Sequence, residues 1–108
     1  MAVEVITEQE FEESILNESK VVLLDFWREG CGPCKALLSE LDSLSGTEED
    51  IKIYKANVDT ESALAEKLRV MAAPTLFFFK DGEIRKKTIG FKSKKSILEA
   101  IGSIEREQ

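Results

Sequence analysis

The sequence predicts an α/β fold in which a mixed β-sheet of about five strands has about four helices spread over both of its faces. Apolar segments of strand length alternate with segments whose apolar residues recur at helical spacing, which is typical of parallel β-α-β units. Asp81-Gly82 separates two further strand-like segments, and this dipeptide favours the tight turn of an antiparallel hairpin. Because 108 residues suffice for one modest core, we expect residues 1–108 to form a single domain.

The first elements are a short strand, a capped helix and a buried strand. Residues 7–10 read Thr-Glu-Gln-Glu, the form of a capping box that begins a helix. Phe11, Ile15 and Leu16 then supply the apolar side of that helix. Residues 21–27 are almost continuously apolar, which indicates a strand covered on both faces.

A helix, a strand and a shorter helix are expected to follow. After the two cysteines, leucines recur at helical spacing, and Gly46 is well placed to end the helix that they predict. Residues 51–58 alternate between apolar and polar side chains, as in a strand, and residues 60–68 predict a short helix. The inward side chains of this short helix are expected to be Ala63, Leu64 and Leu68.

The hairpin and a last helix complete the chain. Residues 75–79, a threonine followed by four apolar residues, form the first arm of the hairpin. Residues 83–89 are rich in charge, which suits an edge strand that must not pair with other molecules. The last helix is amphipathic, with an apolar side made of Ile97, Leu98, Ile101 and Ile104.

The composition, 43% hydrophobic and 33% charged, is that of an ordinary soluble globular protein. No apolar run approaches the ~18 residues of a membrane span, and the chain begins with neither a basic leader nor an apolar signal segment. We therefore expect a cytoplasmic, monomeric protein that has no membrane partner. The net charge of −6 argues against nucleic acid as a partner, because phosphate binding needs a basic face.

The charge is unevenly distributed along the chain. Its beginning is acidic, with glutamates at positions 4, 8, 10, 12, 13 and 18, whereas the region before the last helix is basic. This pattern fits two solvated faces that aid solubility, and it also fits the docking of a charged partner. The residues of the basic region are Lys80, Arg85, Lys86, Lys87, Lys92, Lys94 and Lys95.

The only two cysteines, Cys31 and Cys34, follow closely on the expected buried strand. A helix that begins there places Cys31 at its N-terminus, where unpaired backbone N–H groups and the positive end of the helix dipole favour a thiolate. Pro33 fits the first turn of that helix, where its missing N–H costs nothing. We therefore expect Cys31 to be a nucleophile and Cys34 to be the thiol that resolves the mixed disulfide formed by Cys31.

Two other roles are open to the cysteine pair. A structural zinc site needs four cysteine or histidine ligands, and the chain has no histidine, so that only a dimer sharing two pairs could complete one. A disulfide that merely stabilises the fold would contribute little, because the loop that it closes is short. Redox catalysis is therefore the better explanation. The lack of histidine also excludes a Cys–His protease and a histidine base.

Asp25 interrupts the apolar strand just before the cysteines. A buried and unpaired carboxyl group has a raised pKa, because burial disfavours its charged form. In that case Asp25 could take the proton from Cys34 when this thiol attacks, a role for which the chain offers no histidine. The alternative is an aspartate at an exposed strand end, since acidic residues are mostly exposed.

The segments Leu24-Asp25-Phe26-Trp27 and Cys31-Gly32-Pro33-Cys34-Lys35 together resemble the active-site signature of the thioredoxin family. This resemblance implies the thioredoxin fold and a protein-disulfide reductase that works by dithiol–disulfide exchange. It also implies disulfide-containing protein substrates, no bound cofactor, and regeneration by NADPH through a separate flavin-containing thioredoxin reductase. Further matching segments are Lys55-Ala56-Asn57-Val58-Asp59, Ala73-Pro74-Thr75, Asp81-Gly82 and Ile89-Gly90-Phe91, so that the match spans nearly the whole chain.

The resemblance also assigns roles to individual residues. Asp25 matches the family's buried acid, Lys55 the lysine that sits near it, and Trp27 the tryptophan that packs beside the disulfide. Pro74 matches a cis-proline that faces the cysteines, so that the Ala73–Pro74 bond is expected to be cis. The backbone of Ala73 would then pair with an extended substrate segment. The implied substrate-binding residues are Trp27, Gly30, Gly32, Pro33, Ala73 and Gly90.

Several positions depart from the family pattern. Gly30 stands where a second tryptophan is common, which should expose Cys31 and remove an aromatic substrate contact. Ala73 replaces a larger aliphatic residue, Arg28 adds positive charge near the thiolate, and the helix after Cys34 lacks the family's proline. Two alternative functions stay open: a disulfide isomerase or oxidase of the same fold, and a thioredoxin-like binding module that is not catalytic.

Overall fold

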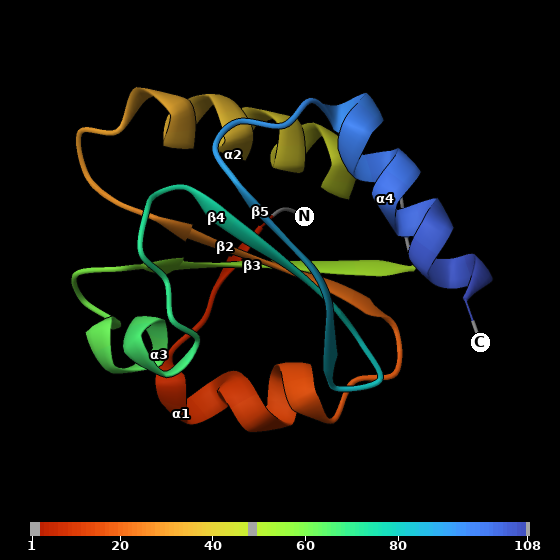
Figure 1. Ribbon diagram of the computed structural model, residues 1–108, viewed down its shortest axis with the longest axis horizontal. Coiled ribbons are helices and arrows are strands. Elements are labelled where there is room, and N and C mark those ends of the chain that lie inside the picture. Colours follow the sequence, from red (N-terminus) through yellow and green to blue (C-terminus); the bar gives the residue numbers. More distant parts are fainter. Residues whose placement is uncertain (1–2, 48–49, 108) are drawn as a thin grey trace.

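The computed structural model describes residues 3–47 and 50–107, and its strands form one mixed sheet (Figure 1). The strand order is β1-β3-β2-β4-β5. The central strand β2 runs parallel to β3 and antiparallel to β4, while β1 is parallel to β3 and β5 is antiparallel to β4. The expected mixed sheet with a C-terminal hairpin and a charged edge strand is therefore confirmed. The strand bounds are β1 Glu4–Val5, β2 Val21–Trp27, β3 Ile51–Asn57, β4 Thr75–Lys80 and β5 Glu83–Ile89.

Helices cover both faces of the sheet. Figure 1 shows α2 and α4 over one face, and α1 and α3 over the other. Within the two described stretches of the chain, no helix is both long and apolar enough to cross a membrane. The helix bounds are α1 Glu8–Phe11, a π-helical segment η1 Glu12–Leu16, α2 Gly32–Ser45, α3 Ser62–Lys67 and α4 Lys94–Arg106.

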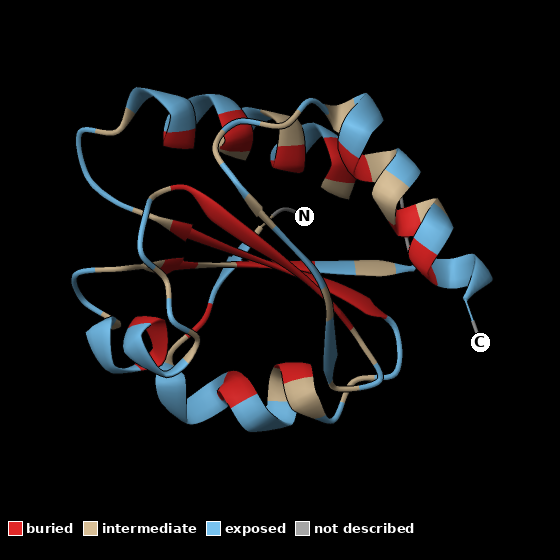
Figure 2. Cartoon of the chain, in the orientation of Figure 1, coloured by how far each residue is buried: buried red, intermediate tan, exposed pale blue. Residues whose placement is uncertain are grey.

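The strand β2 is buried on both faces because helices pack on either side of it (Figure 2). Its side chains alternate between two cores, as the pleat of a strand requires. Leu24 and Phe26 belong to the core under α1 and α3, whereas Leu23 belongs to the core under α2 and α4. Asp25 follows Leu23 on the same face, which places it beneath α2, the helix that carries the cysteines.

The structure corrects the expected details of two helices. The expected helix over residues 60–68 is shorter, and Ala63, which we expected to point inward, is exposed. Leu64 is buried and Leu68 packs against the same core, as expected, but Ala65 takes the inward place expected for Ala63, because α3 turns that side toward the core. The first helix ends in a π-helical turn that the sequence pattern does not show.

The start of the first helix and the hairpin turn follow the sequence signals. The carboxylate of Glu10 accepts hydrogen bonds from the backbone N–H of Thr7 at 3.0 Å and from its hydroxyl at 3.2 Å. Asp81 and Gly82 both have positive φ, +54° and +77°, as a tight hairpin turn requires. Gly82 also packs against Leu16, so that a Cβ at this position would collide with the backbone carbonyl oxygen of Leu16.

We expect Gly82→Ala to lower the free energy of unfolding by about 2 kcal/mol or more, because a side chain there is both strained and obstructed. Urea denaturation followed by circular dichroism measures this loss. Gly46→Ala is the matched control: Gly46 ends α2 with a φ of −82°, and its Cβ would meet the carbonyl oxygen of Ser43 at an ordinary 3.7 Å. Equal losses in the two variants would contradict the argument.

Candidate active site

Cys31 and Cys34 form a disulfide at the start of α2, where the two Cα atoms are 5.2 Å apart. Cys31 is the N-cap residue of the helix, and its sulfur accepts a hydrogen bond from the backbone N–H of Cys34 at 3.2 Å. This is the position at which the helix end favours a negative charge on sulfur. Pro33 lies within the first turn, where it removes no helical hydrogen bond.

The two cysteines differ in exposure. Cys31 is partly exposed, whereas Cys34 is only 3% exposed. A substrate disulfide can therefore reach the sulfur of Cys31 directly, but it cannot reach that of Cys34. Gly32 and Pro33, which lie between them, are exposed on the outer side of the turn.

Asp25 is fully buried, so the alternative of an exposed strand end is wrong. Among the residues that the structure describes, neither of its carboxyl oxygens has a hydrogen-bond partner. Burial raises the pKa of the Asp25 carboxyl group from 3.8 to about 7, and the positive charge of Lys55 lowers that pKa in part. The group can therefore gain or lose a proton near neutral pH.

Lys55 and Trp27 lie beside this carboxyl group. Lys55 is the register partner of Asp25 across β2 and β3. Trp27 is two residues from Asp25 on the same strand and therefore on the same face of the sheet. The ammonium of Lys55 lies 5.9 Å from the centre of the Trp27 ring, a cation–π distance. The structure thus brings together the acid, the lysine and the tryptophan that the resemblance names.

The segment before β4 faces the cysteines, although it is far from them in sequence. The Ala73–Pro74 bond is cis, as expected, and the carbonyl oxygen of Ala73 lies 3.8 Å from the sulfur of Cys31. Gly90, with a φ of +91°, donates its backbone N–H to the carbonyl oxygen of Pro74 at 2.9 Å. The loops before β4 and after β5 are therefore joined beside the disulfide.

Two departures from the family pattern have structural consequences. Gly30 has a φ of +71°, a conformation that favours glycine, and a Cβ there would meet no atom within 4 Å. A cavity of about 110 Å³ lies beside it, with Trp27 and Cys34 among its lining residues. Arg28 forms an ion pair with Asp59 at 3.6 Å, but both side chains are more than half exposed, so the pair contributes little.

Three residues near Pro74 and Gly90 received no site role from the sequence motifs: Thr75, Met71 and Phe91. The hydroxyl of Thr75 donates to the carbonyl oxygen of Ala72 at 2.6 Å and so ties the turn that contains Pro74. Met71, 88% exposed, lines a small pocket together with Ala73, and Phe91, next to Gly90, is 46% exposed. Exposed apolar residues beside a site indicate a contact surface. Only the folded structure reveals this exposure.

Comparison with known proteins agrees with this arrangement. The family model described as Thioredoxin matches residues 2–103. A thioredoxin of Staphylococcus haemolyticus is 40% identical over 102 residues, which cover 94% of this chain and 96% of that protein. A thioredoxin of Streptomyces clavuligerus is 39% identical over 93 residues, which cover 86% of this chain and 87% of that protein.

Two solved structures are also similar to this chain. The crystal structure of a Malassezia sympodialis thioredoxin has a TM-score of 0.84 and 31% sequence identity, and the match covers 94% of this chain and 90% of that one. The crystal structure of a chloroplastic thioredoxin z has a TM-score of 0.89 and 28% sequence identity, and the match covers 99% of this chain and 97% of that one. This chain therefore belongs to the thioredoxin family and, through its Cys31–Cys34 pair, is a protein-disulfide oxidoreductase.

Proposed function

We propose that this protein reduces the disulfides of other proteins in the cytoplasm, with Cys31 as the attacking thiolate, Cys34 as the resolving thiol and Asp25 as the proton acceptor. One observation carries the proposal. The sulfur of Cys31 is partly exposed at the start of α2 and accepts the N–H of Cys34, while Cys34 itself is buried. This asymmetry gives the two thiols different tasks.

In the first step the Cys31 thiolate attacks one sulfur of the substrate disulfide. A bond forms between Cys31 and that sulfur, the substrate S–S bond breaks, and the other substrate sulfur leaves as a thiolate. In the second step Cys34 attacks the sulfur of Cys31. The intramolecular disulfide forms, the mixed disulfide breaks, and the substrate leaves with two thiols, so that two electrons have passed to it from the protein.

Asp25 acts in the second step, because Cys34 must lose its proton to attack. The carboxyl group lies on the face of the sheet that α2 covers, and its pKa of about 7 makes its anion a competent base near neutral pH. Lys55 supports the anionic form of Asp25 through its charge. The groove for the substrate would be formed by Trp27, Gly30, Gly32, Pro33, Ala73 and Gly90.

Regeneration of the dithiol needs two electrons from outside the chain. Membership of the thioredoxin family supports NADPH as their source, through a separate flavin-containing thioredoxin reductase that is the second partner besides the disulfide substrates. Protein thiols are kept reduced in the cytoplasm, whereas disulfides persist in oxidising compartments. A protein that reduces disulfides fits the first environment, which supports a cytoplasmic location. The net charge of −6 disfavours contact with the phosphates of nucleic acid, which supports the expectation that the protein does not bind it.

The equilibrium reduction potential of the Cys31–Cys34 pair tests the direction of the reaction. It is measured by alkylating the protein after equilibration in thiol buffers, and protein alkylated beforehand is the control. We expect about −270 mV, the value typical of thioredoxins. A value of about −180 mV or above would overturn the proposal in favour of a disulfide isomerase or oxidase, since each 30 mV corresponds to about 1.4 kcal/mol for two electrons.

A further inference from the structure

Most of the large apolar side chains that the fold leaves exposed lie beside the disulfide. Five such residues are exposed in the part of the chain that the structure describes, and three of them lie in or next to the loops before β4 and after β5. These two loops are joined beside Cys31 by the bond from Gly90 to Pro74. We call the three residues the apolar rim of the site. The residues of the apolar rim are Met71, Ile89 and Phe91.

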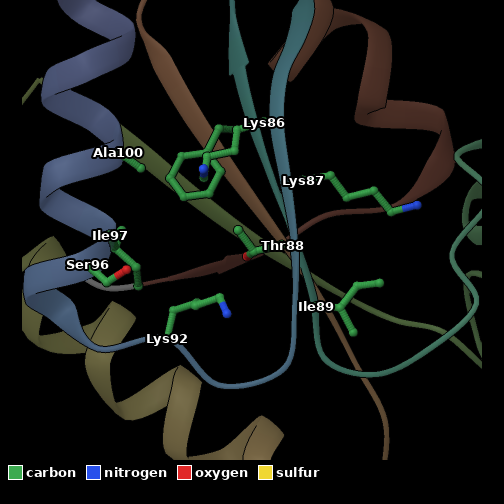
Figure 3. Close-up of a pocket in the computed structure, with 9 residues that line it drawn as sticks. Lys86, Lys87, Thr88, Ile89, Lys92, Ser96, Ile97 and Ala100 are labelled. Atoms are coloured by element: carbon green, nitrogen blue, oxygen red, sulfur yellow. The ribbon is translucent and has the colours of Figure 1, made fainter.

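Ile89 and the loop before β4 lie on the same side of the sheet. Figure 3 shows the side chains of Lys87 and Ile89 on the side of β5 that faces away from α4. On that side the ammonium of Lys87 donates to the carbonyl oxygen of Arg69 at 3.4 Å, two residues before Met71. The apolar rim is therefore built from segments that are far apart in the sequence and meet in the fold.

The loop holds Met71 in its exposed position. Before it, the backbone N–H of Val70 donates to the carbonyl oxygen of Ala65 at 2.8 Å. After it, the carbonyl oxygen of Ala72 accepts a hydrogen bond from the hydroxyl of Thr75 at 2.6 Å. The 88% exposure of Met71 thus belongs to an ordered loop. Its apolar side chain contributes little to the core, but a protein that covered it would gain by removing it from water.

Met71 lies on the approach of a protein substrate to Cys31. It is two residues before Ala73, whose carbonyl oxygen is 3.8 Å from the sulfur of Cys31. It lines a small cavity with Ala73 and a larger one, of about 640 Å³, with Arg28 and Val58. A protein that presents a disulfide to Cys31 is therefore expected to cover Met71 as well, whereas a small disulfide compound can reach Cys31 without touching it.

Met71 also carries a sulfur atom that remains open to oxidation after the cysteines have been joined. Within residues 3–47 and 50–107, every other sulfur belongs to the Cys31–Cys34 disulfide. When hydrogen peroxide oxidises an exposed thioether, the sulfur gives up two electrons and the O–O bond of the peroxide breaks. One oxygen atom bonds to the sulfur, and the other leaves as water. The product, methionine sulfoxide, is polar, and methionine sulfoxide reductases convert it back.

We propose that Met71 is a site of reversible oxidation, and that its sulfoxide weakens the docking of protein substrates. The inference rests on the proposed function, because it concerns the proteins whose disulfides Cys31 attacks. The thioether offers such a protein an apolar contact, whereas the polar sulfoxide loses its hydrogen bonds to water when it is covered. Oxidation of Met71 leaves the chemistry of the cysteine pair unchanged. The oxidised protein therefore reduces small disulfides as before, but protein disulfides more slowly.

Peroxide treatment of the protein in its disulfide form tests the modification and its effect. We expect mass spectrometry of the digested protein to find one added oxygen atom on the peptide that contains Met71. The treated protein is then reduced with dithiothreitol and freed of it, and its rate constants toward insulin and toward bis(2-hydroxyethyl) disulfide are measured. The reduction of insulin should be slowed about fivefold or more, and that of the small disulfide by less than about 1.5-fold.

Three variants assign the effect to this residue. Met71→Leu keeps the apolar contact without the sulfur, so its rate toward insulin should be close to that of the unmodified protein and should not change after peroxide treatment. Met71→Gln should slow the reduction of insulin about fivefold without peroxide, because it places a polar group on the apolar rim. Ile84→Gln is the matched control: Ile84 is 48% exposed at the other end of β5, and its replacement should leave the rate unchanged.

The outcomes distinguish a failure of this inference from a failure of the proposed function. Absence of the added oxygen on Met71, or equal insulin rates before and after its oxidation, would overturn the role of Met71 and leave the proposed function intact. Equal slowing toward both disulfides would also overturn it, since the oxidation would then disturb the cysteines themselves. A loss of rate in peroxide-treated Met71→Leu would assign the effect to another residue. Untreated protein that fails to reduce insulin would overturn the proposed function, and this inference with it.

Discussion

Cys34→Ser is expected to convert the protein into a covalent trap in which Cys31 stays joined to its substrate by a mixed disulfide. The partly exposed sulfur of Cys31 can still attack, but the buried thiol that would release it is gone. Release then depends on thiols from solution. Because a positioned group reacts far faster than a free one, we expect the adduct to live about 10³-fold longer or more.

Mass spectrometry of the variant mixed with a disulfide-bonded protein measures this adduct and its lifetime. Cys31→Ser is the matched control, since it changes one sulfur of the same pair and leaves the other buried at 3% exposure. It should form no adduct and show no turnover. Adducts through Cys34 in that control would reverse the two roles. Partner function retained after both cysteines are replaced would instead support a binding module that is not catalytic.

Asp25→Asn is expected to make the folded protein more stable at alkaline pH, because it removes the part of the pH dependence of stability that Asp25 causes. Burial raises the pKa of Asp25 from 3.8 to about 7, so the folded state holds a proton that the unfolded state has already lost. The contribution of Asp25 to stability is therefore greatest below about pH 4 and is lost as the pH rises through about 7, by about 4 kcal/mol in all. Asparagine carries no such proton.

The measurement is urea denaturation of the oxidised variant and the oxidised unmodified protein at pH 4 and pH 8. The advantage of the variant should be about 4 kcal/mol larger at pH 8 than at pH 4, with effects of the other titrating groups cancelled by the comparison. An advantage that does not change with pH would show that Asp25 is not the group that titrates in the folded protein.

The same variant also tests the proton transfer. At neutral pH, Asp25→Asn should slow the resolution of the mixed disulfide about tenfold or more, while the first attack by Cys31 changes much less. Stopped-flow measurement of the two steps with an excess of substrate separates them. Equal slowing of both steps would count against a specific action of Asp25 on Cys34.

Local patterns in the sequence predict most of the fold. The alternation of strand-like and helical segments, the capping box at residues 7–10 and the turn at Asp81-Gly82 depend on neighbouring residues, and all three appear in the structure. The helix that begins after Cys31 follows the same logic, because Pro33 and the residues after it define its first turn. Conformational preferences of neighbouring residues are kept in the folded protein wherever tertiary packing favours the same conformation.

Tertiary packing decides the parts for which local patterns leave alternatives. Ala63 and Ala65 fit a helix equally well, and only the direction in which α3 meets the core exposes one and buries the other. In the same way, the apolar rim forms only because the loops before β4 and after β5 are joined beside the disulfide. No pattern of consecutive residues records that contact.

The helix that begins at Cys31 directly after a buried strand can be predicted from the sequence, because both features depend on residues next to one another in the chain. The folded arrangement is needed to show that Asp25 is buried, with no partner for its carboxyl oxygens among the residues that the structure describes. It also places the carbonyl oxygen of Ala73 3.8 Å from the sulfur of Cys31. The reason is physical: burial and proximity arise when distant segments exclude water from the same place, and those segments meet only in the folded protein.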